Sequence, residues 1–220
     1  MLRLVIGNKN YSSWSLRAWL LLKEAKIEFE EIPLELGTPS FHAQIPRYSA
    51  AGRVPVLLDG ELAVWDTLAI AEYLAENFPH KHVWPAERAD RARARSMCAE
   101  MHSGFAALRS QWPMNISANL VGKGWNVAVQ KDLDRLVQMW RSALKDHPGP
   151  FLFGPFGAVD AFFAPVMARF VTYGAELPPD IATYRDAILG CEGMRSWIAA
   201  AHQETAYLAD DEPYRLPEGS

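Results

Sequence analysis

The chain of 220 residues has only two cysteines, Cys98 and Cys191, and they stand far apart in the sequence. Two isolated cysteines lack the spacing of a metal-binding cluster, so we predict that the protein has no metal site. We expect both thiols to be reduced and to have a structural role. The cysteines therefore give no indication of disulfide or metal chemistry.

Long hydrophobic runs are also missing. No apolar stretch reaches the roughly 18 residues that a membrane-spanning helix needs. The apolar start, residues 1–6, is too short for the hydrophobic region of a signal peptide. We therefore expect a cytoplasmic protein that makes no membrane contact.

The sequence lacks an excess of positive charge, since 22 lysines and arginines stand against 26 aspartates and glutamates, for a net charge of -4. A nucleic-acid partner would need a basic face, so we expect none. Hydrophobic residues make up 50% of the chain. That fraction can form a sizeable core in one large domain or in two small ones.

The segment that organises the chain is residues 51–67, which predicts a loop, a hairpin and the start of a helix. Apolar runs flank Asp59-Gly60, and this pattern indicates a hairpin with a type I′ turn. Pro55 stands at the head of the first run, and the bond before a proline is the one that adopts the cis form at low cost. A cis bond there would leave the main chain of Val54 free to pair with an extended peptide.

Asp66-Thr67 then opens an amphipathic helix. The N-terminus of a helix has unpaired N–H groups and a partial positive charge, which together bind a carboxylate. Asp66 could pair with an ammonium group, so the site suits the zwitterionic end of an amino acid. The alternative is that Asp66 and Thr67 only cap the helix and that Pro55 only shapes the loop.

The N-terminal part reads as alternating strands and helices. Residues 2–6 predict a buried strand, and helical spacing follows the serine-rich loop at residues 12–15. Residues 27–34 predict a second strand, which Pro33 places at an edge or ends early. Residues 36–51 are irregular, with one short helix. The predicted order is β-α-β, then β-β-α.

A domain boundary is expected at residues 77–85, where Pro79 and Pro85 bracket a polar run. We predict one domain at residues 1–79 and an all-helical one at residues 86–210. The tail after Asp210 is expected to be loose. Helical periodicity predicts five segments, at residues 86–111, 127–145, 157–170, 181–189 and 193–203, with Asp160 as a capping-box acid near the start of the third.

Four features in this order resemble the glutathione S-transferase family: the serine-rich loop, Val54-Pro55, the acid-hydroxyl pair Asp66-Thr67, and the Gly-x-x-Asp opening at residues 157–160. The resemblance implies an α/β N-terminal domain of thioredoxin-like fold followed by an all-α C-terminal domain. It also implies glutathione as the co-substrate and a homodimer. The family usually has Glu-Ser where this chain has Asp-Thr, and commonly Ser or Thr where it has Gly157.

The resemblance implies a residue-by-residue site for glutathione. The main chain of Val54, beside a cis Pro55, would pair with the cysteinyl part, and Asp66 and Thr67 would hold the γ-glutamyl end. Arg53 would approach the glycine carboxylate, with His42 as a weaker alternative.

Residues 12–17, Ser-Ser-Trp-Ser-Leu-Arg, look like the active-site loop of serine-type, zeta-like members. The resemblance implies that Ser12 meets the glutathione sulfur, with Ser13 next and Tyr11 still open. Lowering the thiol pKa from about 8.5 by about two units needs roughly 2.7 kcal/mol, which a hydroxyl donor and a helix dipole can supply. The alternative is that the serines only cap the helix. No cysteine occupies the loop, which argues against disulfide chemistry.

The leading hypothesis is a glutathione transferase that activates the thiol for attack on a small electrophile. The alternatives are a glutathione-dependent cis-trans isomerase of the maleylacetoacetate type, a non-catalytic glutathione-binding module and, less favoured, a peroxidase. The second substrate is expected between the domains. Candidate residues for it are Phe105, Leu108, Arg109, Trp112 and Trp125.

Overall fold

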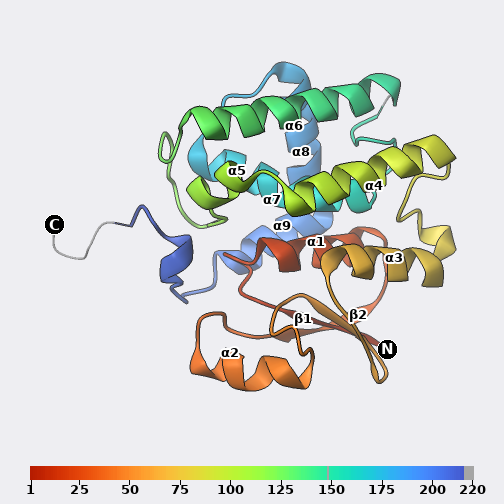
Figure 1. Cartoon of the computed structure of the whole chain (residues 1–220), viewed down its shortest axis with the longest axis vertical. Coiled ribbons are helices and arrows are strands. Elements are labelled where there is room, and N and C mark those ends of the chain that lie inside the picture. Colours follow the sequence, from red (N-terminus) through yellow and green to blue (C-terminus); the bar gives the residue numbers. More distant parts are fainter. Residues whose placement is uncertain (148, 216–220) are drawn as a thin grey trace.

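The computed structural model describes residues 1–147 and 149–215. It has two parts, one built on a four-stranded sheet and one built of helices alone (Figure 1). The elements of the N-terminal part are β1 (Leu2–Ile6), α1 (Ser13–Glu24), β2 (Phe29–Pro33), α2 (Pro39–Gln44), β3 (Val56–Asp59), β4 (Leu62–Val64) and α3 (Thr67–Asn77). This order confirms the predicted β-α-β, then β-β-α.

The sheet has the strand order β2-β1-β3-β4. Strands β1 and β2 are parallel, and the other neighbouring pairs are antiparallel. Pro33 ends β2 at the edge of the sheet, where a missing N–H group breaks no ladder. The thioredoxin-like arrangement expected for this part is therefore present.

Helices cover both faces of the sheet, with α1 and α3 on the face toward the helical part and α2 on the other (Figure 1). Successive residues of a strand point to opposite faces. Accordingly, Leu4 and Ile6 of β1 belong to the large core shared with the helical part. Val5 lies between them in sequence and packs instead with Phe41 of α2 in a small second core.

The predicted hairpin is confirmed, but its turn lies one residue further along. Asp59 pairs with Leu62, so the two turn residues are Gly60 and Glu61. Gly60 has a φ of 56° and Glu61 has a negative φ, which is the pattern of a type II′ turn rather than a type I′ turn. Asp59 stays in the strand, where its carboxylate accepts a hydrogen bond of 2.7 Å from Tyr73.

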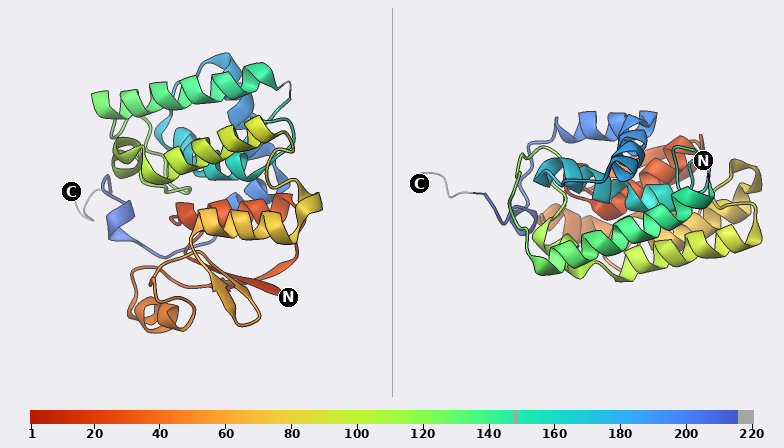
Figure 2. Two further views of the ribbon diagram at one scale, coloured as in Figure 1. Left: turned by 45° about the vertical axis from the view of Figure 1, so that its right-hand side comes forward. Right: turned by 90° about the horizontal axis from the view of Figure 1, so that it is seen from above.

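The C-terminal part is helical throughout, as expected. Helices α4 and α6 run side by side (Figures 1 and 2), and Arg135 of α6 pairs with Glu100 of α4 at 2.6 Å. The helices of the C-terminal part are α4 (Arg88–Ser103), α5 (Ala106–Gln111), α6 (Val127–Asp146), α7 (Ala158–Tyr173), α8 (Pro179–Gly190) and α9 (Glu192–Ala201). Along the described chain, 3₁₀ turns occupy Ile45–Arg47, Pro79–Lys81 and Ala209–Asp211.

The prediction of one helix over residues 86–111 is wrong, because the chain breaks between α4 and α5. Gly104 is extended, and a Cβ atom there would lie 2.7 Å from the carbonyl oxygen of Glu100. Phe105 follows in the left-handed region, with a φ of 56°. Asp132 of α6 then accepts a hydrogen bond of 2.9 Å from the N–H of Leu108 in the first turn of α5. The break gives α5 its own N-terminus beside the cleft between the two parts.

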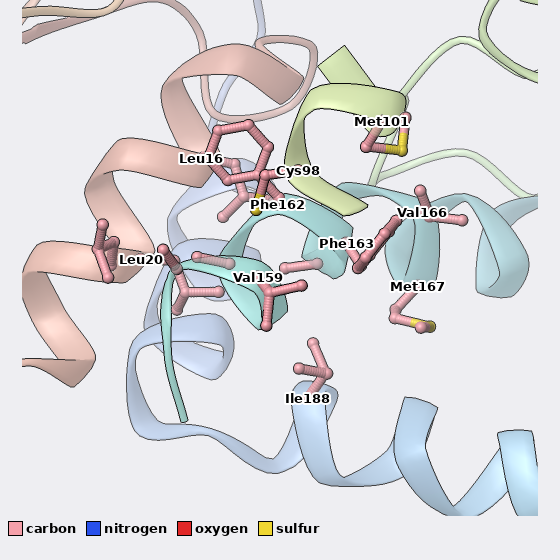
Figure 3. Close-up of a cluster of buried hydrophobic side chains, with 14 of the residues drawn as sticks. Leu16, Leu20, Cys98, Met101, Val159, Phe162, Phe163, Val166, Met167 and Ile188 are labelled. Carbon is pink, nitrogen blue, oxygen red and sulfur yellow. The ribbon is translucent and has the colours of Figure 1, made fainter. Parts of the chain in front are cut away.

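Helix α7 is the centre of the molecule and packs against α1, α4 and α8 (Figure 3). The predicted capping-box acid is confirmed: the Asp160 carboxylate accepts hydrogen bonds from the N–H of Gly157 at 2.9 Å and of Leu152 at 3.1 Å. It also accepts one of 3.0 Å from the hydroxyl of Tyr184 on α8. Asp160 therefore ties the start of α7 to its neighbours from a fully buried position.

The tail was expected to be loose after Asp210, and as far as Arg215 this is wrong. The hydroxyl of Tyr214 donates a hydrogen bond of 2.8 Å to the carbonyl of Gln111. The hydroxyl of Tyr11 bonds to the carboxylate of Glu212. The described part of the tail thus lies beside the junction of the two parts (Figure 2). The rest of the expected tail, residues 216–220, lies outside the described residues.

Two further expectations concern the cysteines and membrane helices. Cys98 and Cys191 are buried free thiols, and burial raises the pKa of Cys98 well above its usual value. Within residues 1–147 and 149–215, no helix combines the length and the hydrophobicity needed to cross a membrane.

Candidate active site

Two adjoining cavities lie between the two parts of the molecule. The first, of about 550 Å³, is lined by Trp14, Ala51, Arg53, Val54, Pro55, Trp65, Asp66, Thr67, His102 and Arg109. The second, of about 760 Å³, is lined by Tyr11, Ser12, Ser13, Trp14, Leu36, Phe41, Gly52, Arg53, Val54, Ala106, Arg109, Ser110, Pro113, Arg169 and Asp211. Because four residues line both cavities, they form one continuous cleft. We call them the first and second cavities.

Val54 lies where the two cavities meet. The bond between Val54 and Pro55 is cis, as expected from the sequence. Within the described part of the chain, neither the N–H nor the C=O of Val54 has a hydrogen-bond partner. Buried main-chain polar groups are almost always paired, and Val54 is half-buried. Those of Val54 are therefore available to a ligand in the cleft.

Asp66 and Thr67 form the start of α3 in the first cavity. Asp66 is the N-cap residue, and its Oδ1 accepts a hydrogen bond of 3.0 Å from the N–H of Leu68. Thr67 does not cap the helix. Its hydroxyl oxygen is buried and, among the described residues, has no hydrogen-bond partner. The capping alternative therefore accounts for part of the role of Asp66 and for none of the Thr67 hydroxyl.

His102, at the end of α4, is a cavity residue that the sequence reasoning did not identify. Its Nε2 lies 3.1 Å from Oδ2 of Asp66. Its Nδ1 is buried and has no partner among the described residues, and its ring meets the Trp14 ring edge-on at 5.0 Å. No local motif marks this histidine, because its contacts depend on how the two parts pack together.

The serine-rich loop brings Ser12 and Ser13 to the second cavity. Ser12 is the N-cap of α1 and is 7% exposed, and its hydroxyl donates a hydrogen bond of 2.7 Å to Oγ of Ser15. Oγ of Ser15 also accepts one of 3.0 Å from the N–H of Gly7. The hydroxyl of Ser13 makes no hydrogen bond within the described residues. Both hydroxyls thus reach the cleft, one bonded and one free.

Tyr11, the third candidate hydroxyl, is engaged with the tail. It bonds to the Glu212 carboxylate and to the carbonyl of Ala206 at 3.2 Å. Burial, together with the Glu212 carboxylate, raises the pKa of Tyr11 to about 12. Its hydroxyl is therefore already committed to contacts within the chain.

Two arginine side chains lie against the ring of Trp14. The guanidinium groups of Arg17 and Arg109 lie 4.3 Å and 4.9 Å from the ring centre, a cation–π arrangement. Arg17 is 1% exposed and donates to the carbonyls of Phe162 and Ser13 at 3.0 Å and 3.3 Å. Burial, and then the charges of other arginines, lower the pKa of Arg17 well below its usual value. Because the guanidinium groups of Arg17 and Arg109 both lie against Trp14, the wall behind the serine-rich loop is electropositive.

The other sequence candidates divide between the cleft and the core. Arg53 and Arg109 line both cavities, whereas His42 lines neither. Phe105, Leu108 and Trp112 are buried in the core. Trp112 and Trp125 line a cavity of about 870 Å³ beside α6. That cavity is larger than either cavity of the cleft, but none of the unpaired polar groups described above lines it, so we place the site in the cleft.

Comparison with known proteins covers most of the chain. The glutathione S-transferase N-terminal domain model matches residues 11–77, and the C-terminal domain model matches residues 86–200. Glutathione S-transferase 1 of Dianthus caryophyllus is 27% identical over 191 residues, which cover 83% of this chain and 85% of that protein. A probable maleylacetoacetate isomerase of Vibrio cholerae is 29% identical over 104 residues, which cover 46% of this chain and 48% of that protein.

A crystal structure of a glutathione transferase homolog from Burkholderia, with bound glutathione, is similar in fold. Its TM-score is 0.71 at 25% identity, and the match covers 92% of this chain and 99% of that one. The two domain models together match residues 11–77 and 86–200, which is more than half of the chain. The chain therefore belongs to the glutathione S-transferase family.

Proposed function

We propose that the cleft binds glutathione and activates its thiol for attack on a small electrophile. One observation carries this proposal. The unpaired main-chain groups of Val54 and the unpaired hydroxyl of Thr67 line the same cavity. A peptide with a free amino-acid end satisfies both groups. The glutathione bound to the Burkholderia homolog supports the choice of that peptide.

Each part of the tripeptide then has a partner. The Val54 main chain pairs with the cysteinyl unit as an added strand would. The γ-glutamyl carboxylate meets the Thr67 hydroxyl at the positive end of α3, and the γ-glutamyl ammonium meets Asp66. Arg53, which lines both cavities, takes the glycine carboxylate. His102 holds the Asp66 carboxylate in place through its 3.1 Å contact.

Thiol activation follows from a chain of hydrogen bonds that ends at Ser12. A contact between two hydroxyl groups runs in either direction, because each is both donor and acceptor. When a sulfur anion binds, Ser12 turns its proton to the sulfur, and Ser15 donates to Ser12 while it accepts from Gly7. Each donor polarises the next. Ser13, whose hydroxyl is free, is the second candidate for this role.

The reaction is a nucleophilic attack by the thiolate, whose proton has passed to solvent. With an aryl halide, the sulfur forms a bond to the ring carbon and the halide leaves with its electron pair. With an activated cis alkene, the sulfur adds to the double bond, the resulting single bond rotates, and expulsion of the sulfur restores the alkene as trans. The similarity to a probable maleylacetoacetate isomerase favours this isomerisation as the second candidate.

Turnover assays separate these functions. Assays with an aryl halide and with a maleyl-type diketo acid distinguish transfer from isomerisation. A non-catalytic binding module would bind glutathione without the ultraviolet absorbance of a bound thiolate. If Ser12→Ala keeps full activity and the thiolate absorbance while Ser13→Ala loses both, the thiol-activating role belongs to Ser13. The homodimer and the cytoplasmic location implied earlier stay predictions, and sedimentation tests the first.

A further inference from the structure

The second cavity carries more positive charge than glutathione binding uses under the proposed function. Three arginines line it, Arg53, Arg109 and Arg169, and Asp211 is the one carboxylate residue among the described residues of its wall. The chain as a whole has a net charge of -4, so composition alone would favour a wall of the opposite sign. A cavity with charge of one sign concentrates ligands of the other sign.

Arg169 of α7 is a rigid buried cation. It is 4% exposed, and it donates hydrogen bonds of 2.6 Å to the carbonyl of Trp112 and 3.2 Å to that of Pro165. Burial, with the charge of Arg109, lowers its pKa to about 10, so it stays protonated at neutral pH. No carboxylate of the described residues forms an ion pair with it. The charge of Asp211, on the same cavity wall, acts on Arg169 without a direct ion pair. A buried cation without a directly paired counter-ion is costly to the fold.

Arg109 of α5 is the second such cation. Its guanidinium donates to the carbonyl of His102 at 3.4 Å and lies over Trp14, and no ion pair holds it within the described part of the chain. Burial lowers its pKa. Arg109 and Arg169 are close enough that the charge of one lowers the pKa of the other. An anion bound by both would offset this repulsion.

The carboxylates of glutathione already have other partners under the proposed function. Its γ-glutamyl end lies at Thr67, and its glycine end lies at Arg53. Arg109 and Arg169 belong to the helical part, on the wall that faces the serine-rich loop. Their charge is therefore left for the second substrate.

Building on the proposed function, we propose that the second substrate is an electrophile that carries a carboxylate group, bound by Arg109 and Arg169. The carboxylate end lies toward α5 and α7, and the reacting carbon lies toward the sulfur at Ser12. This pairing would select anionic acceptors from neutral ones of the same shape.

The test uses two product conjugates of glutathione that differ in one group. One is S-(4-carboxy-2,6-dinitrophenyl)glutathione, and the other has a carboxamide in place of the carboxylate. Each conjugate, and glutathione itself, is titrated into the full-length protein by calorimetry, so that the result does not depend on turnover. The variants are Arg109→Gln, Arg109→Lys and Arg169→Gln, with the exposed Arg88→Gln at the far end of α4 as the control.

In the wild type and in Arg88→Gln, the carboxylate conjugate should bind about tenfold or more tightly than the carboxamide, the range of a charge-assisted hydrogen bond. Arg109→Gln should remove most of this preference without weakening glutathione, and Arg109→Lys should restore part of it. Circular dichroism checks that Arg169→Gln folds. If Arg169→Gln does not fold, the binding data for Arg109→Gln alone test the carboxylate preference.

Equal binding of the two conjugates by the wild type would overturn the inference. A preference for the carboxylate conjugate that survives in Arg109→Gln would also overturn it. So would an equal loss of affinity for glutathione itself in that variant, because the arginine would then bind the tripeptide. If the wild type binds neither glutathione nor either conjugate, the proposed function fails, and this inference fails with it.

Discussion

His102 on α4 reaches across the cleft and places its Nε2 3.1 Å from Oδ2 of Asp66 at the start of α3. The other oxygen of the same carboxylate caps α3 through the N–H of Leu68. A residue of the helical part therefore fixes the orientation of the carboxylate that we assign to the γ-glutamyl ammonium. The two parts of the molecule therefore line one cleft together.

Replacing His102 should weaken glutathione binding more than it slows the chemical step. In His102→Ala, the Asp66 carboxylate loses one of its two fixed contacts, and we expect KM for glutathione to rise about tenfold with kcat little changed. Steady-state kinetics against glutathione measure both constants. The exposed His80→Gln is the control. An unchanged KM in His102→Ala would contradict the positioning role.

Ser15 should act on the thiol from behind Ser12. In Ser15→Ala, Ser12 loses its hydroxyl partner and the N–H of Gly7 loses its acceptor, so the thiolate is less well stabilised. We expect the pKa seen in the pH profile of kcat/KM to rise by about one unit. Ser96→Ala, on the exposed side of α4, is the control. A lower rate at every pH with the same profile would indicate a structural role alone.

Asp211 should make the second cavity respond to pH. Burial raises the pKa of Asp211 to about 6, against the lowering effect of Arg169 and with a small further rise from Asp210. Below this pH, Asp211 is neutral and the wall is more positive. The carboxylate conjugate should therefore bind more tightly as the pH falls through about 6, since an aryl carboxylate stays ionised there.

Asp211→Asn should bind the carboxylate conjugate tightly at all these pH values, and calorimetry at three pH values measures the difference. The variant should not unfold. Because folding raises the pKa of Asp211, the ionised carboxylate disfavours the folded state. The stability that the protonated carboxyl group contributes is lost as the pH rises through about 6. A pH dependence that persists in Asp211→Asn would assign the effect to another group.

Asp160 should contribute strongly to the stability of the fold. Asp160→Ala leaves the buried N–H groups of Leu152 and Gly157 and the Tyr184 hydroxyl without an acceptor. We expect the free energy of unfolding to fall by about 3 kcal/mol or more. Urea denaturation measures it, and Asp180→Ala, which removes a half-exposed partner of Arg141, should cost less than about 1 kcal/mol. Similar losses in the two variants would contradict this account.

The sequence predicts the parts of the molecule that depend on local patterns. Short apolar runs predict β1, β3 and β4. Pro33 predicts the edge of the sheet, and Asp160 predicts the cap of α7, because each effect acts within a few residues. The break at Gly104 is less visible, since the apolar spacing continues through it. The turn at Gly60 is shifted because Tyr73, from a later helix, holds Asp59 in the strand.

The residues that the sequence misses act over long distances. His102 and Arg169 reach the cleft only through the packing of α4 and α7 against the sheet domain, and neither stands in a motif. Asp211 comes from the C-terminal tail, which is expected to be loose because it is terminal. Tyr214 and Glu212 nevertheless bond this tail to the rest of the molecule. Such contacts depend on tertiary structure, which periodicity does not encode.

The central claim is that glutathione lies along Val54 with its γ-glutamyl end at Thr67, and calorimetric titration of glutathione into the wild type and Thr67→Val tests it most directly. Valine keeps the shape of threonine and removes the unpaired hydroxyl. We predict saturable binding to the wild type and about tenfold weaker binding to Thr67→Val. No binding to the wild type, or equal binding to both proteins, would contradict the account.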